Sequence, residues 1–302
     1  MKPILVIGAS GFVGRRLANA LLAEGNTVRC LVRDAARVKD LADAGCEIVQ
    51  GDISDLSSVQ RALPSAQAVY VAIHTLSPQR AGSADQRFMA VESNGLRNVV
   101  TACQAHGVRR IVYVTSLGTA ADASSEWLRE RWKAEEFLLG SGLDVTVIRP
   151  GMIVGAGGRG FDTLVSQARK SVAVLLGGQQ KMRTIAVDDL IFYLVSLLND
   201  SRSYQHRYDV GNDDVLTNSQ MIDVGAEILG RRHPVKLRIP LTLLSLLAPV
   251  IERAGKMPKG SFRGLLDSIQ ADMSGDSGPI RLILPRALLS YRQAAERAVA
   301  TR

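Results

Sequence analysis

Three glycines near the start of the chain have the spacing of an anion-binding turn. Gly8, Gly11 and Gly14 follow directly after a short apolar run, Ile4–Ile7. A strand that ends in a glycine turn and continues as a helix directs backbone N–H groups and the positive end of the helix dipole toward one point. We interpret Gly8 as permitting the turn, Gly11 as admitting a phosphate, and Gly14 as letting the helix pack on the strand. The alternative is a tight connection without a ligand, but a second apolar strand at 28–32 favours nucleotide binding.

Apolar segments typical of strands alternate with helical patterns through the first half of the chain. Strands are predicted at residues 4–7, 28–32, 46–49, 68–73, 110–115 and 145–148. This alternation predicts an α/β fold with a Rossmann-type doubly wound parallel sheet over residues 1–150. Residues 151–302 are predicted to form a smaller mixed α/β region that binds substrate or a partner and packs closely on the first. Ligands bind such sheets at the carboxyl ends of the strands. The residues expected at that edge are Gly8, Arg33, Asp52, Ile73, His74, Ser116 and Pro150.

The second half has a looser pattern of strands and helices. Strands are predicted at 208–210 and 235–239, and helices over 190–198 and from residues 161, 218, 241, 260 and 285. We interpret Asp188 as the N-cap of the helix 190–198, because its carboxylate can accept hydrogen bonds from first-turn amides. The glycine-rich segment 155–160 has two interpretations, a mobile substrate lid or a surface turn.

The composition is that of a globular protein whose charge is not concentrated in one block. Hydrophobic residues make up 46% of the chain, charged residues 22%, and the net charge is +8. The basic residues are spread along the sequence, so we expect no nucleic-acid partner. Cys30, Cys46 and Cys103 have neither CxxC nor His/Cys ligand spacing, which predicts buried free thiols, no metal site and a cytoplasmic location. The apolar run after Lys2 is too short for a signal peptide.

The most apolar stretch of the second half has two interpretations. The predicted helix 241–251 is leucine-rich and is followed by Arg253 and Lys256. It reaches only about half a membrane span, so no transmembrane segment is predicted. Its leucine face would dock on a membrane surface or a partner, or else it is a core or dimer helix, which we favour. A monomer or a homodimer is expected.

With these elements in place, the chain resembles the extended and atypical branches of the short-chain dehydrogenase/reductase superfamily. The resemblance is carried by Gly8–Gly14, Gly51-Asp52, the segments 111–118 and 149–155, and Ile185–Leu190. The motifs occur in order from residue 1 to about 200. The likeness is strongest to the NmrA-like and YbjT-like NAD(P)-binding proteins, and extends to the complex I accessory-subunit group.

The resemblance implies a nicotinamide dinucleotide bound at the carboxyl edge of the sheet. Arg33 occupies the position that faces the adenosine ribose, and a guanidinium there grips a 2′-phosphate, so NADP is favoured over NAD. Alternatively, Arg33 is an exposed loop residue paired with Asp34. Asp52 is expected to accept a hydrogen bond from the adenine amino group. The implied cofactor-binding residues are Gly8, Ser10, Gly11, Phe12, Val13, Gly14, Arg33, Asp52, Ile53, Ala72, Ile73, Lys133 and Pro150.

The usual catalytic group of the family is incomplete. Typical members use Ser, Tyr and Lys, with the Tyr hydroxyl as acid and base. Ser116 fits the serine position and Lys133 the lysine, but Arg129 stands four residues before Lys133, where the tyrosine is expected. Arginine cannot release a proton near neutral pH. Lys133 then binds the nicotinamide ribose or is a solvated helix charge, and Ser116 either polarises a substrate or satisfies loop amides.

His74 is the remaining candidate for the missing proton donor. It follows the fourth strand, where the nicotinamide end of the cofactor is expected, and its imidazole titrates near neutral pH. Capping the strand is its alternative role. The resulting hypothesis is an oxidoreductase acting on a small or medium apolar carbonyl or enone. A non-catalytic NADP(H)-binding redox sensor or assembly factor is the alternative, and an epimerase or dehydratase is a weaker one.

Overall fold

The computed structural model describes residues 2–73, 88–176, 180–239, 241–255, 262, 266 and 273–301. Its centre is a seven-stranded sheet in which every strand pair is parallel. The strand order is β10-β6-β5-β4-β1-β2-β3. The strands are β1 (Ile4–Ile7), β2 (Val28–Val32), β3 (Glu47–Gln50), β4 (Ala68–Val71), β5 (Arg110–Val114), β6 (Asp144–Pro150) and β10 (His206–Val210). The predicted doubly wound α/β fold is therefore confirmed.

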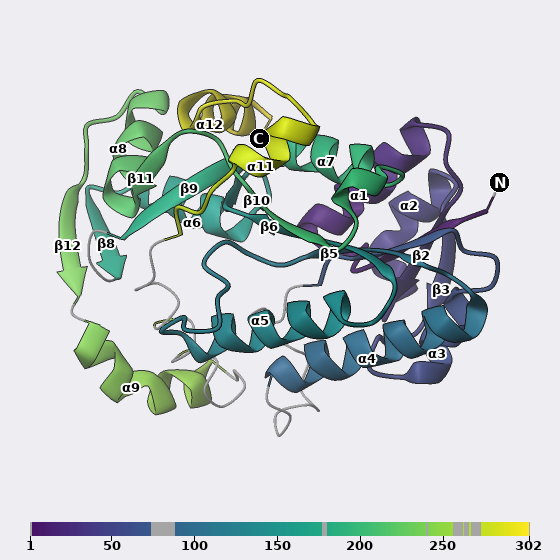
Figure 1. Cartoon of the computed structure of the whole chain (residues 1–302). Coiled ribbons are helices and arrows are strands. Elements are labelled where there is room, and N and C mark those ends of the chain that lie inside the picture. Colours follow the sequence, from purple (N-terminus) through teal and green to yellow (C-terminus); the bar gives the residue numbers. More distant parts are fainter. Residues whose placement is uncertain are drawn as a thin grey trace.

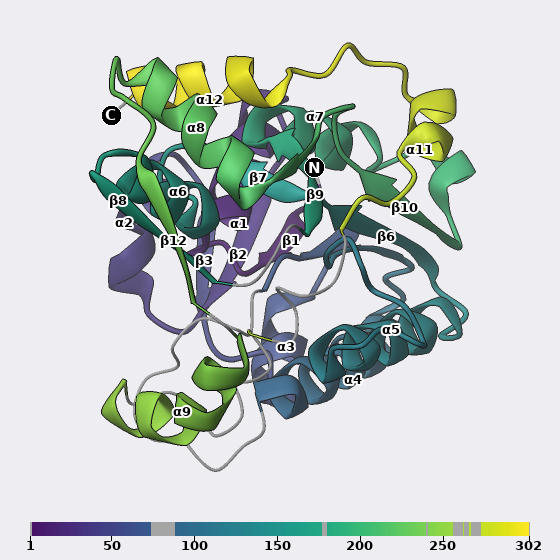
Figure 2. The same ribbon diagram turned by 90° about the vertical axis from the view of Figure 1, so that its left-hand side faces the viewer.

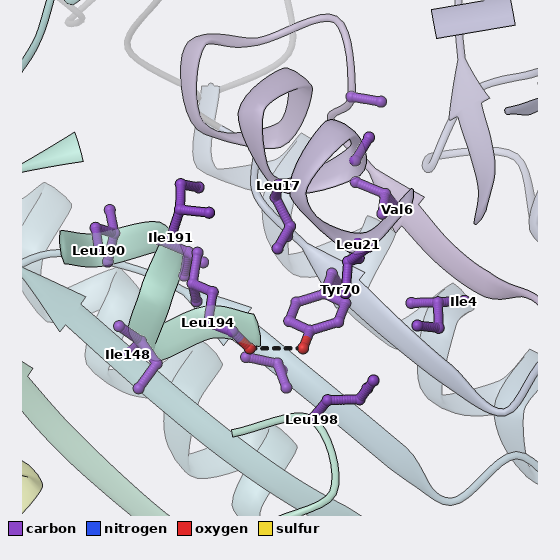
Figure 3. Packing of buried hydrophobic residues seen from close by; sticks show 14 of the residues in the cluster. Ile4, Val6, Leu17, Leu21, Tyr70, Ile148, Leu190, Ile191, Leu194 and Leu198 are labelled. Carbon is purple, nitrogen blue, oxygen red and sulfur yellow. Dashed lines mark hydrogen bonds between the residues drawn. The ribbon is translucent and has the colours of Figure 1, made fainter. Parts of the chain in front are cut away.

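Helices cover both faces of this sheet (Figure 1). One face carries α1 (Phe12–Ala23), α2 (Lys39–Asp43) and α7 (Val187–Ser196), whereas the other carries α3 (Leu56–Ala62), α4 (Phe88–His106) and α5 (Glu126–Leu139). Each face has its own apolar core, because residues of the parallel strands alternate between the two sides. Figure 3 shows the first core, in which Tyr70 donates its hydroxyl hydrogen to the carbonyl oxygen of Leu194 over 2.7 Å.

The order of the strands places the glycine turn at the centre of the sheet. The chain progresses outward from β1 through β2 to β3, and then in the opposite direction from β4 through β5 to β6. The turn after β1 therefore lies where the winding reverses, which is where open α/β sheets bind their ligands.

The second half builds two small sheets and adds one strand to the large one. A three-stranded sheet has the order β11-β9-β7, and a two-stranded sheet pairs β12 with β8. Their strands are β7 (Met152–Val154), β8 (Val172–Leu176), β9 (Lys181–Ala186), β11 (Val215–Thr217) and β12 (Val235–Ile239). The helices are α6 (Arg159–Ala168), α8 (Asn218–Ile228), α9 (Leu241–Ala254), α11 (Gly278–Ile283) and α12 (Tyr291–Ala300), seen from a second side in Figure 2. A third core lies among α6, α8, α12 and these strands.

Several predicted elements need correction. The helix 35–44 divides into a 3-10 turn, η1 (Ala35–Val38), and α2. No helix starts at Pro285: α11 ends at Ile283, and α12 starts after its N-cap, Ser290. The helix from residue 260 lies largely outside the described residues.

The N-cap assigned to Asp188 is also wrong. Helix α7 begins at Val187 and its N-cap residue is Ala186, which places Asp188 inside the first turn. The neighbouring Asp189 accepts instead from Arg286 Nε at 2.8 Å and from the Leu289 amide at 3.0 Å. Asp189 therefore attaches the C-terminal segment. Asp188 and Asp189 both lie in the first turn, where a negative charge interacts favourably with the positive end of the helix dipole, but neither caps the helix.

Candidate dinucleotide-binding site

The turn between β1 and α1 is closed by backbone contacts that exclude side chains. Gly8 has a φ of +96°, and a β-carbon placed on it would lie 2.4 Å from the carbonyl oxygen of Ala72. A β-carbon on Gly14 would lie 2.3 Å from the carbonyl oxygen of Gly8. The Gly11 amide donates to that same oxygen over 2.9 Å. The turn is thus fixed at both ends, while Gly11 at its tip is exposed.

The N-terminus of α1 has the properties of an anion site. Its N-cap is Gly11 in an extended conformation, no side chain caps it among the described residues, and its first turn holds no acid. The first-turn amides of Phe12 and Val13 therefore retain their capacity to donate, with the helix dipole behind them. Ser10 is half-buried in the same turn. We call the glycine turn 8–14 with these amides the cradle. Its donors fit a diphosphate group.

The glycine-rich segment 155–160 packs against the back of this helix. The Phe12 ring lies beneath the Arg16 guanidinium at 4.2 Å, and β-carbons on Gly155 and Gly158 would approach that ring to 3.0 and 3.1 Å. Arg16 also donates to the Ala156 carbonyl over 2.8 Å. These contacts favour the surface-turn interpretation of the segment over the lid.

The residues expected near the adenosine lie together beyond β2 and β3. Arg33 directly follows β2 with 59% of its side chain exposed, and its Nε lies 4.0 Å from a carboxylate oxygen of Asp52. The other oxygen of Asp52 accepts from the amide and hydroxyl of Ser54 at 2.8 and 2.7 Å. Asp34 caps η1 by accepting from the Ala36 amide. An exposed guanidinium next to a fixed carboxylate is suited to a phosphorylated ribose and an adenine amine.

Two arginines of α1, Arg15 and Arg16, are engaged elsewhere. Arg15 forms an ion pair with Asp40 and donates to the Arg37 carbonyl. This contact with Arg15 lowers the pKa of the Asp40 carboxyl. Arg16, as described above, holds the segment 155–160. Arg33 is therefore the best-placed basic side chain for a 2′-phosphate among those that the sequence suggested.

The remaining predicted cofactor residues lie at the same edge of the sheet. Ala72 faces Gly8 and donates its amide hydrogen to the Ile7 carbonyl over 2.9 Å, and Ile73 follows it. Ile53 is buried against Gly95 of α4. The Pro150 carbonyl accepts from the Leu117 amide over 3.0 Å, which holds the loop after β5 against β6. His74 lies outside the described residues, so its role stays a prediction.

Ser116 is the polar group that the fold leaves without a partner at this edge. It follows Thr115 at the end of β5, and its Oγ is buried with no hydrogen-bond partner among the described residues. Buried hydroxyls are normally satisfied. A buried, unsatisfied hydroxyl where ligands bind is suited to donate a hydrogen bond to a ligand oxygen.

The two α5 cations do not converge on Ser116 as an acid–base pair. Lys133 is 71% exposed and its Nζ lies 2.7 Å from Glu130 Oε1. Arg129 donates to the carbonyl oxygens of Ala123 and Ser124 at 2.5 and 2.8 Å. Arg129 therefore holds the segment before α5 and occupies a structural role in place of the tyrosine.

The tyrosines also lie away from this edge. Tyr70 and Tyr113 are interior to strands, as predicted, and donate to Leu194 and to the Glu92 carboxylate. Burial raises the pKa of both phenols above the ordinary value. Tyr208 and Tyr291 donate to carbonyl oxygens of the second half at 3.3 and 3.1 Å. None of these four hydroxyls is placed to serve Ser116.

A buried ionic network that the sequence did not reveal fixes α5 to the sheet. Glu135 is fully buried and receives Arg149 of β6, whose Nε lies 3.1 and 3.0 Å from the two carboxylate oxygens. Arg149 also lies 3.8 Å from Asp209 of β10. Burial raises the pKa of Glu135 and of Asp209. On the inner side of α5, the buried Arg131 lies 3.3 Å from Glu92.

Two further expectations concern thiols and metals. Cys30, Cys46 and Cys103 are free and buried, as predicted. The part of the chain that the structure describes holds no group of three or more His, Cys, Asp or Glu side chains that would bind a metal ion.

Known proteins are similar to this chain in sequence. The chain is 26% identical over 326 aligned positions to sterol demethylase protein B of Methylococcus capsulatus, covering 98% of this chain and 97% of that protein. It is 30% identical over 146 positions to the photosystem II assembly factor Ycf39 of Cyanophora paradoxa, covering 48% of this chain and 44% of that protein.

Solved structures agree on the fold. An NADPH-dependent quinone oxidoreductase of Escherichia coli, in complex with NADPH, superposes with a TM-score of 0.76 at 18% identity, over 97% of this chain and 99% of that one. A nucleoside-diphosphate-sugar epimerase of Staphylococcus aureus has the same TM-score at 16% identity, again over 97% and 99%. At such identities the agreement concerns the fold alone.

The NAD(P)H-binding family matches residues 8–200, which include the glycine cradle, Arg33, Asp52, Ser116 and α5. The match covers well over half of the chain and begins at Gly8. The chain therefore belongs to the NAD(P)H-binding family.

Proposed function

We propose that this chain is an NADPH-dependent reductase of a conjugated carbonyl, an enone or a quinone. The observation that carries the proposal is the buried, unpartnered Oγ of Ser116 at the ligand-binding edge of the sheet. A group in that position can donate a hydrogen bond to a substrate oxygen without losing another partner.

The cradle and its neighbours account for the cofactor. The amides of α1 after Gly11 would hold the diphosphate, Arg33 the 2′-phosphate, and Asp52 the adenine amine. When bound, the nicotinamide supplies a hydride.

The substrate class follows from the proton donors near Ser116. Reduction of a saturated ketone produces an alkoxide about as basic as hydroxide, which requires a positioned acid. Arg129 is held by backbone carbonyls and Lys133 is exposed beside Glu130, so α5 supplies no acid in the manner of a tyrosine. Reduction of a quinone or enone places the charge on a phenolate or enolate, and a phenol has a pKa of about 10. A hydrogen bond from Ser116 and a proton from water suffice for such an oxygen.

The names of two similar proteins support an apolar substrate. The M. capsulatus protein, similar over almost its whole length, is named for sterol demethylation, and a sterol is apolar. The E. coli neighbour acts on quinones. Both are consistent with an apolar substrate here, and the quinone oxidoreductase also with a conjugated one.

One observation favours a second function, a non-catalytic NADP(H)-binding sensor or assembly factor. Arg129 and Lys133 are both engaged in contacts that have no role in proton transfer. The similarity to a photosystem II assembly factor over about half of the chain supports the same alternative. Cofactor binding without turnover would be its signature.

Oxidation of NADPH with menadione and 2-cyclohexenone as acceptors tests the proposal. We expect Ser116→Ala to lower kcat about 100-fold while leaving the Kd for NADPH within threefold, since one oxyanion donor contributes roughly that factor. Ser277→Ala is the matched control, because Ser277 Oγ is also buried and unpartnered among the described residues. Equal rates for the two variants, or NADPH binding without consumption in the native protein, would overturn the assignment.

A further inference from the structure

Helix α9 lies at the periphery of the molecule and outside its apolar cores. In both views it extends below the end of β12, away from the layered body (Figures 1 and 2). None of the three core clusters contains a residue of α9. Its inner face is short, with Ala248 2% and Glu252 7% exposed. Packing on the main sheet therefore does not account for its leucine-rich sequence.

The outer face of α9 is apolar. Leu246 is 78% exposed, Val250 66% and Leu247 45%. Leu246 and Val250 are four residues apart and so lie on one side of the helix, opposite Ala248 and Glu252. A helix with exposed leucines on a separate face is typical of a surface that binds something apolar.

The strand that leads into α9 extends this apolar surface. β12 pairs only with β8 among the described strands, and Val235 and Leu237 on it are 71% and 56% exposed. Because these two residues are two positions apart on the strand, their side chains lie on the same face of the small sheet. Val172 of β8, 47% exposed, stands directly beside Val235 in the strand register. We call Val172, Val235, Leu237, Leu246, Leu247 and Val250 the apolar edge.

The exposed charges next to the apolar edge are mostly positive. Residues 228–251 contain no Asp or Glu but include Arg231, Arg232, Lys236 and Arg238. Lys236 is neutralised by Asp223, whereas Arg232 and Arg238 are exposed. Arg253, in the last turn of α9, is also exposed. The occupant of this surface is therefore expected to be both apolar and anionic.

We propose that the apolar edge binds the headgroup boundary of a bilayer that contains anionic phospholipid. An apolar helix face bordered by Lys and Arg lies in that boundary, parallel to the membrane plane. At 14 residues α9 is about 21 Å long, short of the roughly 30 Å hydrocarbon core. None of the described helices is long and apolar enough to cross a membrane. The proposal thus takes the membrane-surface interpretation of this helix in place of the core or dimer helix.

A second copy of the chain fits this surface less well. A two-fold interface would place the same mostly basic surface on both sides, and like charges facing each other disfavour association. Anionic lipid supplies the opposite charge. The proposal does not rest on the reductase assignment, because it concerns residues outside the cofactor cradle.

Flotation of the full chain with phosphatidylcholine vesicles, with or without 30% phosphatidylglycerol, tests the proposal. We expect flotation with the anionic vesicles only, weakened at least threefold by 0.5 M salt. The double variant Leu246→Glu, Val250→Glu should remain unbound while keeping the native Kd for NADPH. Leu282→Glu is the control, because Leu282 of α11 is 84% exposed on another element and should leave flotation unchanged.

A Leu246→Trp variant adds a direct reading of insertion. Its emission should shift to shorter wavelength on addition of anionic vesicles, in excess of any change in the native protein, which has Trp127 and Trp132. Native protein that stays unbound with anionic vesicles would overturn the proposal. So would a dimer, seen by light scattering, that the double variant dissociates, since it would assign the apolar edge to self-association.

Discussion

Two regions at the same edge of the sheet differ in how they are built: the β1–α1 turn and the outer face of α5. At the turn, Gly8 and Gly14 lie so close to backbone carbonyls that no side chain fits. On α5, Lys133 is mostly exposed and Arg129 is used to hold the preceding segment. The cofactor cradle is therefore built from backbone, whereas the chemistry that we propose depends on one serine hydroxyl. Enzymes of this fold can thus keep the cofactor cradle and change the proton donor.

The largest expected effect concerns the turn itself. Gly8→Ala combines a positive φ with a contact to the Ala72 carbonyl, so we expect NADPH binding to fall at least 100-fold, measured by isothermal titration. Gly25→Ala is the matched control: its φ is +78°, but a β-carbon there meets nothing within 4 Å. It should cost about 1 kcal/mol of stability and leave the affinity unchanged. If Gly8→Ala proves unfolded, Gly11→Ala at the exposed tip supplies the affinity measurement.

The next effect concerns how α5 is held. Glu135→Ala leaves the Arg149 guanidinium without its main partner, and we expect the free energy of unfolding to fall by about 3–5 kcal/mol in urea denaturation. The adjacent Glu136→Ala removes a 53% exposed partner of Arg207 and should cost about 0–1 kcal/mol. Similar losses for the two variants would show that the buried network does not position α5.

Cofactor choice gives a smaller, selective effect. Removing the exposed guanidinium in Arg33→Ala should weaken NADPH binding about 10- to 100-fold and leave NADH binding within threefold, because only NADPH carries the 2′-phosphate. Arg15→Ala, whose side chain is paired with Asp40, should not change the ratio. Tighter binding of NADH than of NADPH by the native protein would contradict the assignment of Arg33.

The smallest effect is expected at the position of the missing tyrosine. Arg129→Ala removes two hydrogen bonds to loop carbonyls, so we expect a decrease in Tm of about 2–4 °C and a kcat within twofold of native. A loss of kcat greater than tenfold with an unchanged Tm would mean that Arg129 acts on the substrate.

Local patterns predicted much of the fold. Strands β1, β2 and β12 have the predicted bounds, because apolar periodicity and turn residues define such segments from nearby sequence. The place of β10 at the edge of the main sheet was beyond local reasoning, since β10 pairs with β6 from more than 50 residues away. Asp188 was misassigned because α7 starts at Val187, two residues earlier than a cap at Asp188 requires.

The candidate site was predictable in its backbone but not in its side-chain partners. Glycine spacing suggested the cradle, which depends on backbone geometry. The sequence could not show that Arg15 binds Asp40, that Arg129 binds loop carbonyls, or that Ser116 lacks a partner. These contacts join segments that approach only in the folded chain.

The most direct test of the central claim compares conjugated and saturated acceptors with the same cofactor. The kcat/KM for NADPH oxidation is measured with 2-cyclohexenone, menadione and cyclohexanone. A site with a hydrogen-bond donor at Ser116 but no tyrosine on α5 predicts at least a 100-fold preference for a conjugated acceptor. Comparable turnover of cyclohexanone, or tight NADPH binding with no consumption of NADPH, would contradict it.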